Sequence, residues 1–258
     1  MLMKMSALPE AIRRRLDPAQ RFGLRLTLFA LTIVLVFVPF GILLEQVVDE
    51  GPLTTYDRAI VEDLHEVVGD HPGLVEPLQV LSFLGKPIWF YFLVGAACLY
   101  LLLRKRIRLI IYLVTTGLLG GAIDTAVKVL VSRPRPELDD PVATAFGQSF
   151  PSGHAFTSTA IYGALLLVFL PALDRKWRYF AVGAYVALVT AISFSRLALG
   201  VHFLSDVLGG VVLGAAWLIA STAAFEIWRV ERGRKAAHPI TEGVEPEAGE
   251  ELKLKHSS

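Results

Sequence analysis

Residues 109–131 read LIIYLVTTGLLGGAIDTAVKVLV, and this stretch contains only two charged residues, Asp124 and Lys128. A helix of roughly 20 mostly apolar residues crosses the hydrocarbon core of a bilayer, so the stretch has the length and composition of a membrane span. Backbone polar groups in hydrocarbon must pair within the segment, which favours a helix over an isolated strand. The stretch therefore predicts an integral membrane protein.

Five further apolar runs lie on either side of this stretch, and none contains Asp, Glu, Lys or Arg. They are residues 26–44, 87–103, 155–173, 179–195 and 207–225. The first is interpreted as a retained span, because no small-residue cleavage site follows it. Together the six runs predict an all-α, polytopic membrane helical bundle with six transmembrane helices.

The composition of the whole chain agrees with a membrane protein. Of the 258 residues, 54% are hydrophobic and 19% are charged, whereas soluble domains carry about 25% charged residues. This composition excludes a purely soluble enzyme and a disordered chain, and the single cysteine, Cys98, excludes an intrachain disulfide. The net charge of +1 gives no reason to expect a nucleic-acid partner.

Basic residues gather on one side of the six-span arrangement, and loops rich in Lys and Arg normally face the cytoplasm. The clusters are Lys4, Arg13, Arg14, Arg15, Arg21 and Arg25; Arg104, Lys105, Arg106 and Arg108; Arg175, Lys176 and Arg178; and Arg229, Arg232, Arg234 and Lys235. We therefore expect both termini to be cytoplasmic. The absence of eukaryotic sorting signals favours the inner (plasma) membrane of a bacterium.

The chain is expected to divide into three parts: a basic N-terminal segment at 1–25, a six-span domain at 26–228 and a cytoplasmic tail at 229–258. The six-span domain includes an acidic extracytoplasmic insert at 45–86. Residues 241–258 are polar, rich in Glu and free of aromatic residues, a composition that predicts a disordered tail.

The insert itself contains a helical pattern. Thr54 and Asp57 have the spacing of an N-terminal capping box, and His65 and His71 are interpreted as solvated histidines rather than as a metal site. Apolar residues recur at the spacing of one helical stripe, which predicts a short amphipathic helix. The stripe consists of Tyr56, Ile60, Val61, Leu64, Val67 and Val68.

Three polar clusters stand at the ends of predicted spans. The first runs from Lys128 to Pro136, the second is PSGH at 151–154, and the third joins Ser195-Arg196 to His202 and Asp206. In the six-span arrangement all three fall on one membrane face, opposite the basic clusters. We therefore expect a site on the extracytoplasmic side.

The cations of these clusters suit an anion. Lys128, Arg135 and Arg196 are costly at a membrane face unless they meet negative charge, and the planar fork of arginine matches phosphate oxygens. Ser152 is a favourable N-cap residue and Gly153 allows close approach of the backbone, so the first N–H groups of the fourth span could also face an anion. Together they predict a cradle for a phosphoryl group.

The histidines suit nucleophilic and acid–base chemistry. His202 and Asp206 are four residues apart, so Asp206 could accept the Nδ1 proton and leave Nε2 free as a nucleophile. His154 offers a second imidazole for proton transfer to a leaving oxygen. Each of these patterns also has a structural reading, since such His–Asp pairs and Ser-Gly caps are common in ordinary helices.

Other polar and small residues are more simply explained by structural roles. Asp124 stands one turn before Lys128 and is expected to compensate its charge, although catalysis stays a lesser alternative. Gly210 and Gly214 form a GxxxG pattern, which is typical of close packing between spans. Arg133 either adds to the phosphate cradle or is a solvated neighbour, and the sequence leaves both open.

Taken jointly, the clusters resemble the type 2 phosphatidic acid phosphatase family, which shares its phosphate site with vanadium-dependent haloperoxidases. The family pattern is K-x6-RP, then PSGH, then SR-x5-H-x3-D. The chain matches it in order and spacing with Lys128, Arg135, Pro136, Pro151, Ser152, Gly153, His154, Ser195, Arg196, His202 and Asp206.

The resemblance implies a role for each matching residue. His202 would attack phosphorus and become a phosphohistidine, Asp206 would orient it, and His154 would protonate the leaving group and then activate water. The family uses no metal or other cofactor. The residues expected to bind the phosphoryl oxygens are Lys128, Arg135, Ser152, Gly153 and Arg196.

These observations predict an integral membrane lipid phosphatase within a lipid bilayer. The expected substrate is a phosphate monoester or diphosphate of a membrane lipid, such as undecaprenyl diphosphate, phosphatidylglycerophosphate or phosphatidic acid. Two alternatives stay open: a haloperoxidase-like or soluble-substrate phosphatase on the same cradle, and a non-catalytic lipid-phosphate binder or transporter. Six spans argue against the first, and the presence of both histidines argues against the second.

Overall fold

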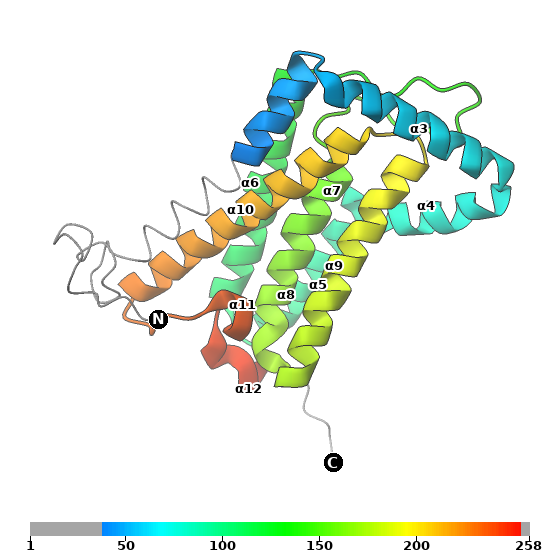
Figure 1. Ribbon diagram of the computed structural model, residues 1–258. Helices are drawn as coiled ribbons and strands as arrows, with labels where there is room; N and C mark the ends of the chain where they lie inside the picture. Colours follow the sequence, from blue (N-terminus) through cyan, green and yellow to red (C-terminus); the bar gives the residue numbers. More distant parts are fainter. Residues whose placement is uncertain (1–37, 254–258) are drawn as a thin grey trace, which may run out of the picture.

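Every regular element between residues 38 and 253, the part of the chain that this computed structural model describes, is helical (Figure 1). The all-α class is therefore confirmed for these residues. The main helices are Val38–Val48, α3 (Pro52–Asp70), α4 (Val75–Phe83), α5 (Pro87–Leu103), α6 (Ile107–Val131), α7 (Gly153–Thr157), α8 (Gly163–Phe169), α9 (Arg175–Ala198), α10 (Leu204–Glu231), α11 (Pro239–Glu242) and α12 (Gly249–Leu252).

Four of the helical runs are long and apolar enough to cross a membrane: α6, the continuous run Gly153–Ala172 that contains α7 and α8, α9, and α10. A fifth span is possible if Pro72–Phe83 and α5 act together, although they meet at a bend of 44°. The chain is therefore a multi-pass membrane protein. Residues 26–37, most of the predicted first span, lie outside the described residues, so the count of six stays a prediction.

The run Gly153–Ala172 is the central span. In its most apolar window 67% of the residues are buried, against 22% to 33% for α6, α9 and α10. Close approach by α10 explains part of this burial, because a Cβ added at Gly210 would lie 2.5 Å from the Ser152 carbonyl oxygen. At Gly214 it would lie 2.6 Å from the Phe156 carbonyl oxygen. The interpretation of Gly210 and Gly214 as packing residues is confirmed.

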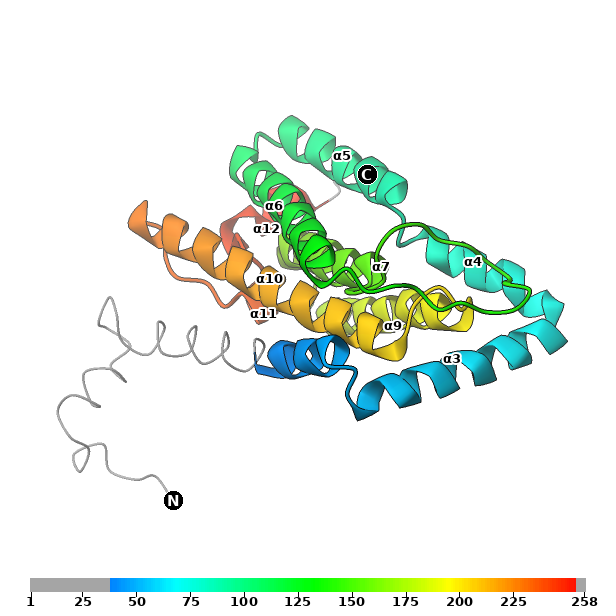
Figure 2. The same ribbon diagram turned by 90° about the horizontal axis from the view of Figure 1, so that it is seen from above.

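The two ends of the bundle are built differently (Figure 1). Helix α3 lies across one end, and α11 and α12 lie at the other. Figure 2 looks down on the α3 end, where the end of α9 lies between α3 and α4. At the opposite end three basic clusters contact the C-terminal segment: Arg106 pairs with Glu251, Arg178 donates to the Thr241 carbonyl and Arg229 pairs with Glu247. The fourth basic cluster, within residues 1–25, lies outside the described residues.

Helix α3 forms where the insert was expected to be helical, but its start and its buried face differ from the prediction. It begins at Pro52 after Gly51, and neither Thr54 nor Asp57 caps it. The capping-box prediction is therefore wrong, because Asp57 is fully buried against the bundle. The buried residues of the helix are Asp57, Val61 and Val68, whereas Tyr56 and Val67 of the predicted stripe are exposed.

His65 lies in α3 and His71 is the C-cap residue of the same helix, and each forms a hydrogen bond with a main-chain carbonyl group. The His65 Nε2 atom lies 2.7 Å from the Asp139 oxygen, and the His71 Nδ1 atom lies 2.9 Å from the Val67 oxygen. His71 is exposed, as expected, but His65 is half-buried. The contact with Asp139 links α3 to the long connection between α6 and α7.

The C-terminal segment is ordered where the composition predicted disorder. Val244, Ala248 and Leu252 are buried in the core cluster that includes residues of α5, α6 and α8, and the Val244 N–H donates to the Leu167 carbonyl at 3.0 Å. The prediction is wrong over residues 241–253. These three apolar side chains recur every fourth residue, so a few well-placed contacts dock a segment whose overall composition is polar.

Candidate active site

His202 lies in the short turn between α9 and α10 and is 2% exposed. Its Nδ1 atom is 3.4 Å from Oδ2 of Asp206, which is fully buried in the first turn of α10. The same Oδ2 accepts the Phe203 N–H at 2.9 Å. Asp206 thus caps the start of α10 and contacts His202, as the spacing of the two residues predicted.

Asp206 also connects the third polar cluster to the other two. Its Oδ2 accepts the Ser149 hydroxyl, its Oδ1 accepts Arg133 Nη1 at 2.6 Å, and its carbonyl accepts the Ser152 N–H at 2.9 Å. The close packing of α10 on α7 accounts for the main-chain bond between Ser152 and Asp206. The carboxylate is consequently held from several directions.

Arg135 places a positive charge beside the Nε2 atom of His202. Its Nη1 atom lies 3.1 Å from His202 Nε2, the atom expected to attack phosphorus. The guanidinium also fixes the connection between α6 and α7 by donating to main-chain carbonyls of Phe146, Gly147, Gln148 and Val201. These hydrogen bonds hold the Arg135 guanidinium, and therefore its charge, in one position.

Lys128 reaches the start of the central span. A Cβ added at Gly153 would lie 2.9 Å from Lys128 Nζ, so any side chain at this position would displace the lysine. Lys128 forms an ion pair with Asp124 one turn earlier, which confirms the expected charge compensation. Ser152 stands at the N-cap position with an extended backbone, but its hydroxyl does not cap the helix.

The bend between α4 and α5 closes another side of the site. Ser82, near the end of α4, accepts a hydrogen bond of 2.5 Å from Arg196 Nη1. At Gly85 an added Cβ would lie 2.7 Å from Cδ2 of His154, so the backbone of the bend packs directly on that imidazole. Ser82 and Gly85 belong to the same bend, so Arg196 and His154 lie against one short stretch of backbone. All eight predicted site residues therefore come together at the α3 end of the bundle.

Three polar atoms of this cluster are buried without a hydrogen-bond partner among the residues that the structure describes. They are Ser152 Oγ, His154 Nε2 and Arg196 Nε. Buried polar groups are nearly always paired in proteins. A hydroxyl, an imidazole and a guanidinium could all be satisfied by one anion that offers several oxygens. The site is thus chemically suited to a phosphoryl group.

The surroundings of His202 keep its imidazole neutral at physiological pH. Burial lowers the pKa of His202 from 6.5 to about 4, and the charges of Arg135 and Arg196 act in the same direction. The Asp206 carboxylate opposes them only in part. A neutral imidazole that donates its Nδ1 proton to Asp206 leaves Nε2 unprotonated, and the Nε2 lone pair accepts from Arg135 in this structure.

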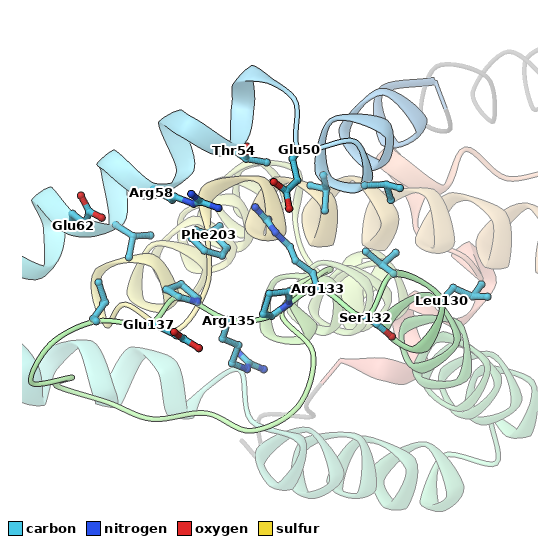
Figure 3. A pocket seen from close by; sticks show the side chains of 17 residues that line it. Glu50, Thr54, Arg58, Glu62, Leu130, Ser132, Arg133, Arg135, Glu137 and Phe203 are labelled. Carbon is cyan, nitrogen blue, oxygen red and sulfur yellow. The ribbon is translucent and has the colours of Figure 1, made fainter.

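A cavity of about 580 Å³ opens beside this cluster (Figure 3). It lies between α3, the helix Val38–Val48 and the segment that follows α6. Arg133 and Arg135 contribute to its lining, whereas neither His154 nor His202 does. The cavity is therefore a neighbour of the predicted phosphate site and shares Arg135 with it.

Sequence reasoning missed several residues of the site and left one undecided. Ser149 and Ser82 carry no motif that would single them out, and Asp57 is one of many acidic residues in the insert. Arg133 follows neither of the two alternatives left open, because it is 9% exposed and bridges Asp57 and Asp206. In each case the partner lies far away in the sequence.

Comparison with known proteins places this geometry in a family context. The profile of the PAP2 superfamily matches residues 107–229. The chain is 36% identical over 97 residues to phosphatidylglycerophosphatase B of Bacillus subtilis, covering 36% of this chain and 46% of that protein. It is 32% identical over 162 residues to decaprenylphosphoryl-5-phosphoribose phosphatase of Mycobacterium tuberculosis, covering 61% of this chain and 84% of that protein.

The fold has a counterpart among solved structures. The crystal structure of a transmembrane PAP2-type phosphatidylglycerolphosphate phosphatase from Bacillus subtilis superposes with a TM-score of 0.67 at 22% sequence identity. The match covers 79% of this chain and 98% of that one. At this level of identity the similarity supports the helical architecture, while the chemistry must be argued from the side chains.

Proposed function

The chain belongs to the PAP2 superfamily, and on that premise we propose that it removes a phosphoryl group from a membrane lipid through a phosphohistidine intermediate. The observation that carries the proposal is a set of three buried atoms that have no hydrogen-bond partner between residues 38 and 253, namely Ser152 Oγ, His154 Nε2 and Arg196 Nε, within the same cluster as His202. These atoms are suited to the oxygens of a phosphoryl group bound in front of His202 Nε2.

The first half-reaction transfers the phosphoryl group to the protein. His202 Nε2 attacks phosphorus, the bond between phosphorus and the leaving oxygen breaks, and His154 gives that oxygen a proton. The imidazole of His202 becomes positively charged, and the Asp206 carboxylate stabilises it through Nδ1. Fixed cations, Arg135 and Arg196 among them, balance the charge on the phosphoryl oxygens.

The second half-reaction returns the protein to its starting state. His154, now neutral, accepts a proton from water as the water oxygen attacks phosphorus. The bond between phosphorus and His202 Nε2 breaks, and inorganic phosphate leaves. The protonated His154 is then ready to act as an acid in the next cycle.

The substrate class follows from the position of the site and from the relatives. The cluster stands at the end of membrane-spanning helices, where the headgroup of a lipid would lie. The names of the two relatives, phosphatidylglycerophosphatase B and decaprenylphosphoryl-5-phosphoribose phosphatase, describe phosphorylated lipids. We therefore favour a phospholipid or polyprenyl substrate, such as phosphatidylglycerophosphate, phosphatidic acid or undecaprenyl diphosphate.

Phosphate release from a panel of these lipids, with detergent-purified protein, tests the function directly. At least one lipid should be hydrolysed, EDTA should leave the rate largely unchanged, and vanadate should inhibit because it can mimic five-coordinate phosphorus. Activity that disappears with EDTA and returns with Mg²⁺ would contradict charge neutralisation by fixed cations. Tight binding of a lipid phosphate without hydrolysis would instead favour a binding protein.

We also place both termini in the cytoplasm and the site on the extracytoplasmic face of a bacterial inner membrane. The support is the gathering of three basic clusters at the end of the bundle opposite α3, together with the excess of basic residues that cytoplasmic loops carry.

The orientation can be tested by labelling in intact cells. After replacement of Cys98 by serine, Asp139→Cys should react with a membrane-impermeant thiol reagent, because Asp139 is exposed at the α3 end. Asp174→Cys, at the opposite end, serves as the matched control and should react only after lysis. The reverse pattern would overturn the proposed orientation.

A further inference from the structure

Asp57 belongs to α3, and its buried carboxylate lies next to the first turn of α10, which carries Asp206. Asp57 is 0% exposed, although it belongs to a helix that lies across the end of the bundle. Its Oδ1 atom accepts the Ser205 N–H at 2.9 Å, and its Oδ2 atom accepts the Ser205 hydroxyl. Ser205 is the neighbour of Asp206 in the first turn of α10, so Asp57 is anchored directly behind the residue that contacts His202.

Arg133 joins Asp57 to Asp206. Its Nη2 atom donates to Asp57 Oδ2 at 2.8 Å, and its Nη1 atom donates to Asp206 Oδ1 at 2.6 Å. The guanidinium lies 4.3 Å above the ring of Phe203, which fixes its plane. Figure 3 shows Arg133 pointing toward α3, while Arg135 leaves the same segment in another direction.

The two oxygens of Asp206 have different partners. Oδ2 faces His202 Nδ1 and also accepts from Ser149 and the Phe203 N–H, whereas Oδ1 accepts from Arg133. The rotation of the carboxylate, and with it the position of Oδ2 beside His202, therefore depends on where Arg133 is held. A guanidinium has a rigid planar fork, so an anion on one arm determines the direction of the other.

We propose that Asp57 is a positioning residue for catalysis, which acts through Arg133 to fix the Asp206 carboxylate and thereby the His202 imidazole. The inference rests on the proposed phosphatase function. It makes α3 part of the catalytic apparatus rather than only a cover for the end of the bundle. A purely structural ion pair is the competing explanation, because buried pairs also lock the register of packed helices.

The substitution Asp57→Asn tests this role with little change of shape. The amide oxygen can still accept from the Ser205 N–H, but Arg133 loses its second anion and its fixed direction. Turnover per folded molecule should fall by about 10- to 100-fold, the range found when residues behind metal ligands are changed. KM should change little, because Asp57 contacts none of the predicted phosphate-binding side chains. Asp63→Asn, an exposed position of the same helix, is the matched control and should behave like wild type.

The double variant Asp57→Asn/Arg133→Gln separates positioning from folding. It removes both charges of the Asp57–Arg133 pair, and the Asp206 carboxylate, which also loses Arg133, keeps the Ser149 hydroxyl and the Phe203 N–H. If Asp57 acts through Arg133, the double variant should turn over at the same rate as Arg133→Gln alone, because the connection is already broken in that variant. If the double variant is slower than Arg133→Gln by the full factor seen for Asp57→Asn, Asp57 acts independently of Arg133 and the proposal is wrong. The comparison of the double variant with Arg133→Gln therefore also tests the inference if Asp57→Asn alone does not fold.

The tautomer of His202 provides a readout that needs no substrate. In ¹⁵N-histidine NMR of the full-length protein, wild type should hold the proton on Nδ1, because Asp206 can only accept. Asp57→Asn and the double variant should shift part of the population toward an Nε2–H ring. An unchanged tautomer, or a rise in KM with kcat unchanged, would overturn the proposal. If wild type hydrolysed none of the lipids, the proposed function would fail, while the tautomer measurement would still decide whether Asp57 holds the His202 imidazole through Arg133 and Asp206.

Discussion

Replacing His202 with alanine is expected to abolish turnover and, with it, every trace of a phosphorylated protein. The neutral imidazole has its Nδ1 atom beside Asp206 and its Nε2 atom 3.1 Å from Arg135, so it is the group placed to attack phosphorus. Loss of a catalytic nucleophile typically lowers turnover by roughly 10⁶-fold. Water cannot efficiently replace His202 as the nucleophile, because the remaining residues stabilise transfer of the phosphoryl group to the imidazole nitrogen.

The experiment combines steady-state turnover with rapid quenching of a radioactive lipid phosphate, under alkaline conditions that preserve phosphohistidine. Wild type should retain label on the protein in the first turnover, and His202→Ala should retain none. His71→Ala is the matched control, since this histidine is exposed and its ring bonds only to the Val67 carbonyl. A labelled His202→Ala protein, folded and monodisperse, would disprove the assignment of the nucleophile.

Four of the predicted spans and the proximity of the predicted site residues could be inferred from the sequence, because their signals are local or modular. An apolar run marks the position of a span, because a helix that crosses the hydrocarbon core must consist mostly of apolar residues. The proximity of His202 and Asp206 follows from four-residue spacing at the start of a helix. The meeting of Lys128, Gly153 and Arg196 could be expected because their spans end on the same membrane face.

The supporting contacts were not predictable, because each depends on how distant elements pack. Asp57 matched a local capping pattern with Thr54, yet its carboxylate is used by Arg133 and Ser205, which lie in other elements. A capping bond to solvent-exposed N–H groups contributes little compared with pairing a buried arginine. The local pattern was therefore a poor guide wherever a buried charge required a partner.

The C-terminal segment illustrates the opposite error. Its average composition is that of a disordered tail, and only Val244, Ala248 and Leu252 contradict this. Those side chains fill a core cluster made by several spans, a surface that composition does not reveal. Two acidic residues of the segment, Glu251 and Glu247, pair with Arg106 and Arg229, so they act as partners of the bundle rather than as a solubilising tail.

His154 should behave differently from His202, because its expected role depends on the leaving group. Its ring packs against Gly85 and its Nε2 atom has no partner among the described residues, which leaves that nitrogen available to a substrate oxygen. Removing a general acid or base commonly slows a step by about 10²–10⁴-fold. With a lipid substrate, His154→Ala should therefore slow both formation and hydrolysis of the phosphohistidine by factors of that order.

An activated substrate distinguishes the two histidines. A nitrophenyl phosphate releases a weakly basic phenolate that requires little protonation, so His154→Ala should recover partial formation of the phosphoenzyme. The second half-reaction should stay slow, because water activation still lacks its base, and labelled protein should accumulate. His202→Ala should show neither effect with any leaving group. Complete loss in both variants with every substrate, in folded protein, would rule out this division of roles. A phosphoryl group trapped on His154 would reverse it, since the nitrogen without a protein partner would then be the nucleophile.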